Sequence, residues 1–229
     1  MVLSHKLYVK LWYLLITIFM MIGVLMMTAN SNAQSAPLHE AVRNHDVKQV
    51  MALVKTEALE ARDDQGRTAL MIATQQNHAK IAKILIYAGA DVNAKNNIQD
   101  TPYLLAGAQG YNDILKLTLE YGANIKDTNR FGGNTIIPAA EKGHPETVKI
   151  LLKAGVDPNH INKLGWTALL ETIILGNGSP LYTEIAEILI QGGADVNIPD
   201  GEGVSALHHA KQKGYQDMVD LLIKSGAKE

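Results

Sequence analysis

The sequence predicts an all-α solenoid of about six repeated units, because two markers recur along it with the same period. The first marker is the run Gly-Ala-Asp-Val-Asn, which is complete at 89–93 and 193–197. Altered copies stand at 122–125, 155–159 and 226–227. Successive copies start 33 residues apart, except that the copy at 193 follows the copy at 155 by 38. Four units therefore share one length, and the fifth carries five extra residues.

The second marker is a small polar residue at the start of each unit's first helix. These residues are Thr68, Thr101, Asn134, Thr167 and Ser205, and their spacing is the same as that of the first marker. Such a side chain can accept a hydrogen bond from an amide of the first helical turn that otherwise lacks a partner. Pro102 fits the position after Thr101, because proline has no amide to leave unpaired there. We therefore expect all five residues to cap helices.

The end of the first helix is predicted by a residue nine positions after the cap. Gly110, Gly143, Gly176 and Gly214 stand there, and Asn77 replaces glycine once. Glycine and asparagine tolerate the left-handed conformation that closes many helices. A second helix follows, with apolar residues at helical spacing such as Val148, Leu151 and Leu152. One such pair cannot bury its apolar face alone, so neighbouring units must supply the core.

These units resemble the ankyrin repeat. The runs 68–73 and 101–106 are similar to the Thr-Pro-Leu-His-x-Ala pattern of that family, and looser copies begin at 36, 134, 167 and 205. The resemblance implies a helix-turn-helix plus a β-hairpin-like loop in each unit. It places an ankyrin-repeat domain at 34–229, with units at about 36–62, 63–95, 96–128, 129–161, 162–199 and 200–229.

The first 33 residues have the layout of a secretory signal peptide. They contain Lys6 and Lys10, an uncharged run at 11–27 and the small residues of Ser31-Asn32-Ala33. We expect cleavage after Ala33 and a periplasmic or secreted protein. The alternative is an uncleaved inner-membrane signal anchor, because the run is long for a signal peptide and just short of a comfortable membrane span. The chain has no cysteine, so the core must hold the fold without disulfides.

Composition limits the partners. Removal of residues 1–33 leaves 196 residues (229 − 33) and a charge of about −4, from 19 basic and 23 acidic residues. A nucleic-acid-binding domain is expected to carry a basic stripe, so nucleic acid is not an expected partner. We expect a monomer that binds a protein and has no contact with the membrane once the signal peptide is removed.

Catalytic and metal-binding motifs are missing from the sequence. It contains no phosphate-binding loop, no His-Glu-x-x-His and no Gly-x-Ser-x-Gly. Four of the eight histidines occupy positions where ankyrin repeats commonly have histidine, which favours structural hydrogen bonds: His39, His78, His144 and His208. We predict no catalytic residue, no metal ligand and no cofactor.

Apolar residues in the third to fifth units stand where the repeat normally faces solvent. They are Ile98, Phe131, Leu164, Trp166, Ile174 and Leu175, and the insertion at 176–182 adds Tyr182. Equivalent positions of consecutive repeats lie side by side, so we predict one contiguous patch that binds a protein partner. The alternative is that some of them fold back onto their own loops, with Trp166 packed under the neighbouring loop.

The expected function is a non-enzymatic protein-protein interaction module of the bacterial envelope. The stretch from Phe131 through 142–144 and 163–169 to 195–197 resembles a group of exported bacterial ankyrin proteins with a longer fifth unit, and this narrower resemblance implies the same location. One alternative is an immunity protein that neutralises a periplasmic toxin. A second alternative, from a different class, is a histidine-based metal carrier or enzyme that uses His208.

Overall fold

The computed structural model describes residues 36–228, which lie within one compact unit at 36–229. The predicted signal peptide lies outside the described residues. Twelve helices form six consecutive pairs, and no strand occurs between residues 36 and 228. Their bounds are α2 Pro37–Arg43, α3 Val47–Leu53, α4 Ala69–Gln75, α5 Ala79–Tyr87, α6 Pro102–Ala108, α7 Asn112–Glu120, α8 Ile136–Glu141, α9 Pro145–Lys153, α10 Ala168–Ile174, α11 Pro180–Gln191, α12 Ala206–Lys213 and α13 Gln216–Lys224. None of these helices is long and apolar enough to cross a membrane.

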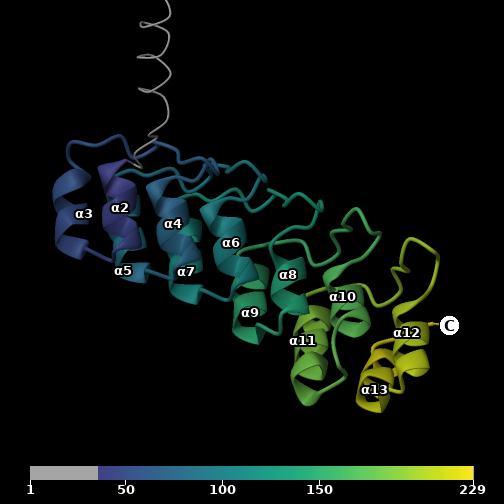
Figure 1. Ribbon diagram of the computed structural model, residues 1–229. Helices are drawn as coiled ribbons and strands as arrows, with labels where there is room; N and C mark the ends of the chain where they lie inside the picture. Colours follow the sequence, from purple (N-terminus) through teal and green to yellow (C-terminus); the bar gives the residue numbers. More distant parts are fainter. Residues whose placement is uncertain (1–35, 229) are drawn as a thin grey trace, which may run out of the picture. The chain divides into compact units, whose positions relative to one another are not determined.

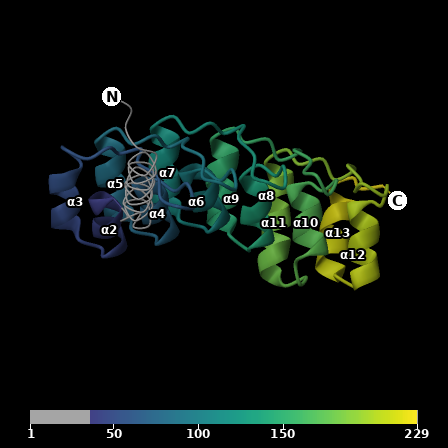
Figure 2. The same cartoon turned by 45° about the horizontal axis from the view of Figure 1, so that its top comes forward.

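The helix pairs follow one another in a row and form two layers (Figure 1). The even-numbered helices α2 to α12 make up one layer and the odd-numbered helices α3 to α13 the other, and each helix packs against its equivalent in the next pair (Figure 2). The loops that lead from one pair to the next project together from one end of the helices. This is the predicted all-α solenoid.

One continuous apolar core runs between the two layers from the first unit to the last. Equivalent residues of the second helices fill it, and each is fully buried: Leu85, Leu151, Leu189 and Leu222. Burial of a leucine side chain contributes about 1.5 to 3 kcal/mol relative to exposure. Because each of these helices packs against the next, that contribution depends on the neighbouring units.

Four of the five predicted helix caps are confirmed. The hydroxyls of Thr68, Thr101, Thr167 and Ser205 each accept a hydrogen bond from the amide three residues later. The prediction for Asn134 is wrong, because α8 begins two residues later, at Ile136. The Asn134 amide group instead donates to the carbonyl of Asp157, 2.8 Å away, and so joins two loops rather than capping a helix.

The predicted left-handed residues are confirmed at three glycines and at Asn77, where φ is 55°. The prediction for Gly176 is wrong, since the left-handed residue of the turn between α10 and α11 is Gly178. The five-residue insertion explains the shift. Helix α11 has 12 residues where α9 has nine, so three of the added residues extend the helix and the other two lengthen the turn before it.

The asparagine that ends each Gly-Ala-Asp-Val-Asn run joins neighbouring units. The Asn93 amide group donates to the carbonyl of Gly122 at 3.1 Å, and its oxygen accepts the amide of Asn124 at 2.8 Å. Asn159 and Asn197 make the same two contacts with the fifth unit and with the end of the chain. Lys126 replaces this asparagine in the third unit. The recurrence of the run thus has a structural cause, which is hydrogen bonding between repeats.

Candidate interaction surface

Each connection between two units ends in a tight turn, here called a finger. Five fingers lie at 63–67, 96–100, 129–133, 162–166 and 200–204. In each, the amide of the first residue donates to the carbonyl of the fifth at 2.9 to 3.0 Å. The first residue is always Asp or Asn, and its side-chain oxygen accepts the amides of the third and fifth residues. The implied hairpin-like loop is therefore a hydrogen-bonded turn that presents the side chain of its third residue.

Three consecutive fingers present large apolar side chains. Ile98, Phe131 and Leu164 are 45%, 55% and 58% exposed, and together they are called the tip row below. The flanking fingers carry Gln65 and Glu202 at the same position, and both are exposed. Fingers are also joined to each other, since the amide of Lys163 donates to the carbonyl of Phe131 at 3.0 Å. The exposure predicted for these three residues is confirmed.

Three of the other four predicted residues are not fully exposed. Trp166 and Ile174 are half-buried and pack against the core, so the prediction that they face solvent is wrong. Trp166 is the last residue of its finger, and only the cap residue Thr167 separates it from the buried start of α10. Leu175 is 49% exposed, but it stands at the far end of α10, about 10 Å of helix away from the tips. The predicted patch is therefore divided.

Tyr182 is a packing residue of the elongated turn. Its hydroxyl donates to the carbonyl of Glu141 at 3.0 Å, and its ring is half-buried. A Cβ on Gly176 would come within 2.7 Å of that ring, so the glycine is needed for the close approach. Tyr215 repeats the arrangement one unit later, where its hydroxyl donates to Gly176 and its ring covers Gly178. The aromatic side chain predicted for partner contact thus joins the fourth and fifth units.

A groove of about 270 Å³ lies beside the tip row, between α6 and α8. Leu104, Leu105, Ala108 and Pro138 line it from the two helices, and Phe131 lines it from the finger. Four charged side chains also line it: Asp100, Arg130, Glu141 and Lys142. The Arg130 guanidinium lies 4.7 Å from the centre of the Phe131 ring. Sequence patterns did not reveal this groove, because its two walls are 30 to 40 residues apart in the chain.

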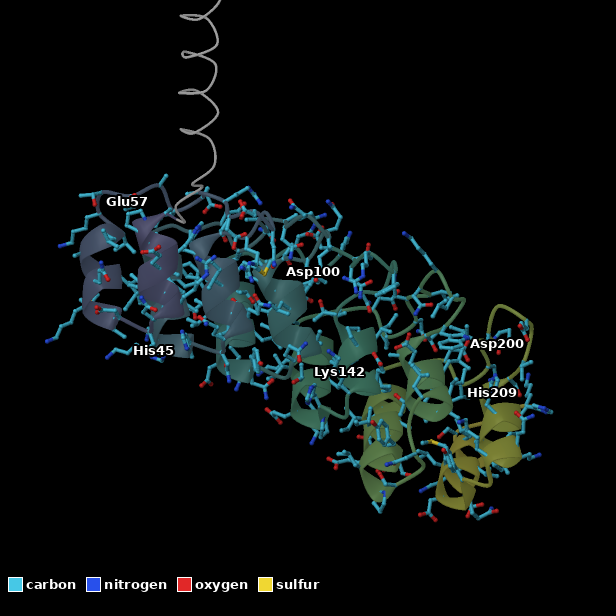
Figure 3. All side chains as sticks on the ribbon, in the orientation of Figure 1. His45, Glu57, Asp100, Lys142, Asp200 and His209 are labelled. Atoms are coloured by element: carbon cyan, nitrogen blue, oxygen red, sulfur yellow. The ribbon has the colours of Figure 1, made fainter. Side chains whose placement is uncertain are left out.

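Glu171 is a buried carboxyl group on α10, only 6% exposed. The side-chain amide of Asn162, at the base of its finger, donates to it at 2.7 Å. Burial, and secondarily the negative charge of Glu141, raises the pKa of Glu171 to about 7, although the hydrogen bond from Asn162 acts in the opposite direction. In the last unit, His209 and Asp200 occupy the equivalent positions and lie 2.7 Å apart (Figure 3). A carboxylate therefore meets an amide donor in one unit and an imidazole in the next.

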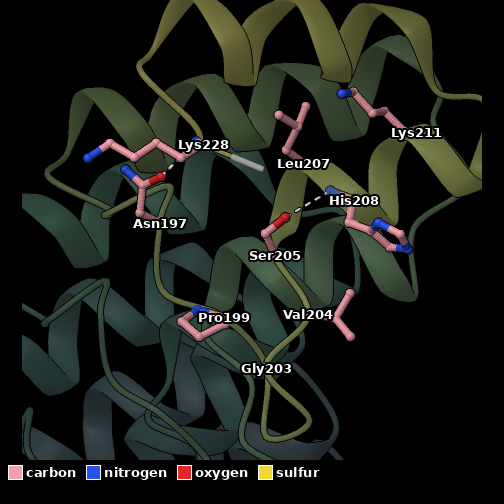
Figure 4. Close-up of a pocket in the computed structure, with 9 residues that line it drawn as sticks. All are labelled: Asn197, Pro199, Gly203, Val204, Ser205, Leu207, His208, Lys211 and Lys228. Atoms are coloured by element: carbon pink, nitrogen blue, oxygen red, sulfur yellow. Dashed lines mark hydrogen bonds between the residues drawn. The ribbon is translucent and has the colours of Figure 1, made fainter.

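A second depression, of about 600 Å³, lies at the last unit and includes Pro199, Leu207 and His208 (Figure 4). The His208 side chain is exposed, while its backbone amide donates to the Ser205 hydroxyl at 3.1 Å. Within residues 36–228 no group of three His, Cys, Asp or Glu side chains could hold a metal ion. His39 instead contacts the carbonyl of Ala61 at 3.0 Å, a structural role of the predicted kind.

Comparison with known proteins identifies the repeat. A family model described as ankyrin repeats (3 copies) matches residues 15–96, 103–200 and 136–229. The chain belongs to the ankyrin-repeat family. Proteins of this family generally mediate protein-protein interactions, and the fold is typically a non-enzymatic scaffold.

Bacterial ankyrin-repeat proteins are among its relatives. The crystal structure of an ankyrin repeat domain from Acinetobacter baumannii is 53% identical, with a TM-score of 0.81, over 84% of this chain and 98% of that one. The ankyrin repeat domain of Bcl-3, of the IkappaB family, is 27% identical, with a TM-score of 0.78, over 86% and 89% of the two chains. The putative ankyrin repeat protein YahD of Escherichia coli is 36% identical over 62 residues, which are 27% of this chain and 31% of YahD.

Proposed function

We propose that this ankyrin-repeat protein binds another protein through its third to fifth repeats and catalyses no reaction. The observation that carries the proposal is the tip row, in which Ile98, Phe131 and Leu164 are each about half exposed on consecutive fingers. Exposed apolar clusters on soluble proteins mark interaction sites. The polar tips Gln65 and Glu202 on either side limit the cluster to the central repeats.

The groove between α6 and α8 extends the proposed surface from the fingers onto the even-numbered helices. Phe131 belongs to both, since it is a finger tip and also lines the groove. A partner that covers Phe131 therefore reaches the groove as well. Leu175 offers a further apolar contact at the other end of the helices.

The test is the double substitution Phe131→Ala with Leu164→Ala. Because both side chains are more than half exposed, we expect a change in the free energy of unfolding of no more than about 0.5 kcal/mol for each. A central interface residue can contribute about 2 kcal/mol or more, so the variant is expected to lose capture of the partner from cell extract. Capture and the thermal midpoint are the two measurements.

The matched control is Gln65→Ala with Glu202→Ala, which changes the two polar tips on the flanking fingers. It is expected to keep both folding and capture. If the Phe131 and Leu164 variant unfolds, these side chains belong to the core and the proposed surface is wrong. If the variant still captures the partner, the partner binds elsewhere.

We propose the bacterial envelope as the site of action, most simply the periplasm. The support is the sequence of residues 1–33, with two lysines, a long uncharged run and Ser31-Asn32-Ala33. The expected result is a mature chain that begins at Gln34, as measured by intact mass on protein from the periplasm. A full-length mass in the membrane fraction would instead indicate the inner-membrane signal anchor.

The identity of the partner would distinguish a general adaptor from a toxin-neutralising immunity protein. Both use the same surface, and both require a protein ligand. A captured partner that is toxic when produced alone in the periplasm, and harmless when produced with this protein, would favour immunity.

A further inference from the structure

The groove between α6 and α8 is lined by charged side chains that form no ion pair within residues 36–228. We propose that this groove holds a basic side chain, lysine or arginine, from an extended segment of the protein partner, with its cation on the carboxylate of Asp100. The inference rests on the proposed function, since it names the chemistry that the partner presents beside the tip row.

Asp100 is the first argument. It is half-buried at the end of its finger, immediately before the cap residue Thr101 (Figure 3). Its backbone amide is bonded to Asn96, but within residues 36–228 its carboxylate has no hydrogen-bond or ion-pair partner. Burial raises the pKa of the Asp100 carboxyl above its ordinary value, although Arg130 and Lys142 act in the opposite direction. The nearby cations therefore do not compensate for the water that this carboxylate has lost.

The depth of the charges is the second argument. Four charged side chains line the groove, and none of these four forms an ion pair with any residue between 36 and 228. Arg130 and Lys142 are exposed, so water solvates their cations. Asp100 and Glu141 are half-buried, so their carboxylates are only partly solvated. The charge that needs a partner is therefore negative, and a ligand with a cation complements it.

The shape of the groove is the third argument. Leu105, Ala108, Phe131 and Pro138 line the same groove as Asp100. Lysine and arginine combine an aliphatic stem with a charged end, so the stem can pack on this apolar lining while the cation reaches the carboxylate. Arg130, Lys142 and Gln109 also line the groove, and they can donate hydrogen bonds to the carbonyl groups of an extended chain. This combination favours a peptide segment over a small cation.

The experiment selects ligands from random peptides, so the partner does not have to be identified first. A phage library of random linear decapeptides is selected against the full chain, and the enriched peptides are synthesised. We expect a basic position in them, and its replacement by glutamine should weaken binding about tenfold or more, as is typical when a hydrogen bond to a charged group is lost. Against the Asp100→Asn variant, the same replacement should have little effect. This loss of coupling is the specific expected result.

Two controls accompany the selection. Asp113→Asn makes the same chemical change on the exposed part of α7 and should leave the tenfold difference intact. Asp100→Asn should fold with an unchanged or higher thermal midpoint, because it removes a poorly solvated charge. If Asp100→Asn fails to fold, the carboxylate serves the fold and the inference is overturned.

The other outcomes also decide the question. A selection that yields no binder, or binders whose basic residues do not couple to Asp100, overturns the inference. Failure of the inference is distinguishable from failure of the proposed function. Peptides or partners that lose binding with Phe131→Ala and Leu164→Ala, but do not respond to Asp100→Asn, would leave the tip row as an interaction surface without a basic side chain in the groove.

Discussion

Replacement of Leu151 by alanine is expected to lower the free energy of unfolding by about 2 to 5 kcal/mol. The side chain is fully buried on α9, and this helix packs against α7, α8 and α11. Truncation would therefore leave a cavity at the junction of the third, fourth and fifth units, in addition to the lost burial. Urea unfolding monitored by circular dichroism measures the loss.

The matched control is Leu164→Ala, the same substitution at a side chain that is 58% exposed. A change of no more than about 0.5 kcal/mol is expected there. If both substitutions cost the same small amount, the helix register of the fourth unit is wrong. If unfolding of Leu151→Ala occurs in two steps, the row of repeats has separated at this position, which is the behaviour expected of units stabilised by their neighbours.

The fold could be predicted from the sequence because its contacts repeat. Each cap, turn and buried leucine recurs at a fixed spacing, so a local pattern reports a contact between units. The prediction failed where the repeat is irregular. Asn134 bonds to the carbonyl of Asp157 instead of capping a helix, and the added residues of the fifth unit moved the left-handed glycine from Gly176 to Gly178.

The candidate surface could be predicted only in part. A finger tip is set by its own turn, so the exposure of Ile98, Phe131 and Leu164 follows from their position in the repeat. Tyr182 bonds to Glu141 of the preceding unit and Trp166 packs against the core, so both side chains are half-buried where the sequence suggested solvent. The sequence alone does not distinguish an exposed finger tip from a half-buried packing residue, because both kinds of residue are large and apolar.

The charged groups of the central repeats were not predicted. The contact between Asn162 and Glu171 spans nine residues and joins a finger to a helix. The equivalent pair of Asp200 and His209 has the same separation and the opposite arrangement of donor and acceptor. The equal separation of these two pairs was a signal in the sequence for the buried carboxyl of Glu171. It can be recognised only once the finger geometry is known.

Glu171→Gln is expected to stabilise the protein at neutral and alkaline pH. The pKa of this carboxyl is raised from an ordinary value of 4.5 to about 7, so the folded chain holds the proton more tightly than the unfolded chain. Stability falls with rising pH wherever the folded state binds more protons. The cost of burying the charge is therefore absent below pH 4.5, grows between pH 4.5 and 7, and is complete above pH 7.

Glutamine has nearly the shape of glutamate, keeps an oxygen that accepts from Asn162 and carries no charge. The variant should be more stable than the natural protein by up to about 3 kcal/mol at pH 8, since each pKa unit corresponds to about 1.4 kcal/mol. The difference should shrink toward zero at pH 4, as measured by urea unfolding at both pH values. Glu146→Gln, on an exposed part of α9, is the control and should change little at either pH. A Glu171→Gln effect that is equal at pH 4 and pH 8 would contradict the raised pKa and show that the carboxyl is already compensated in the folded protein.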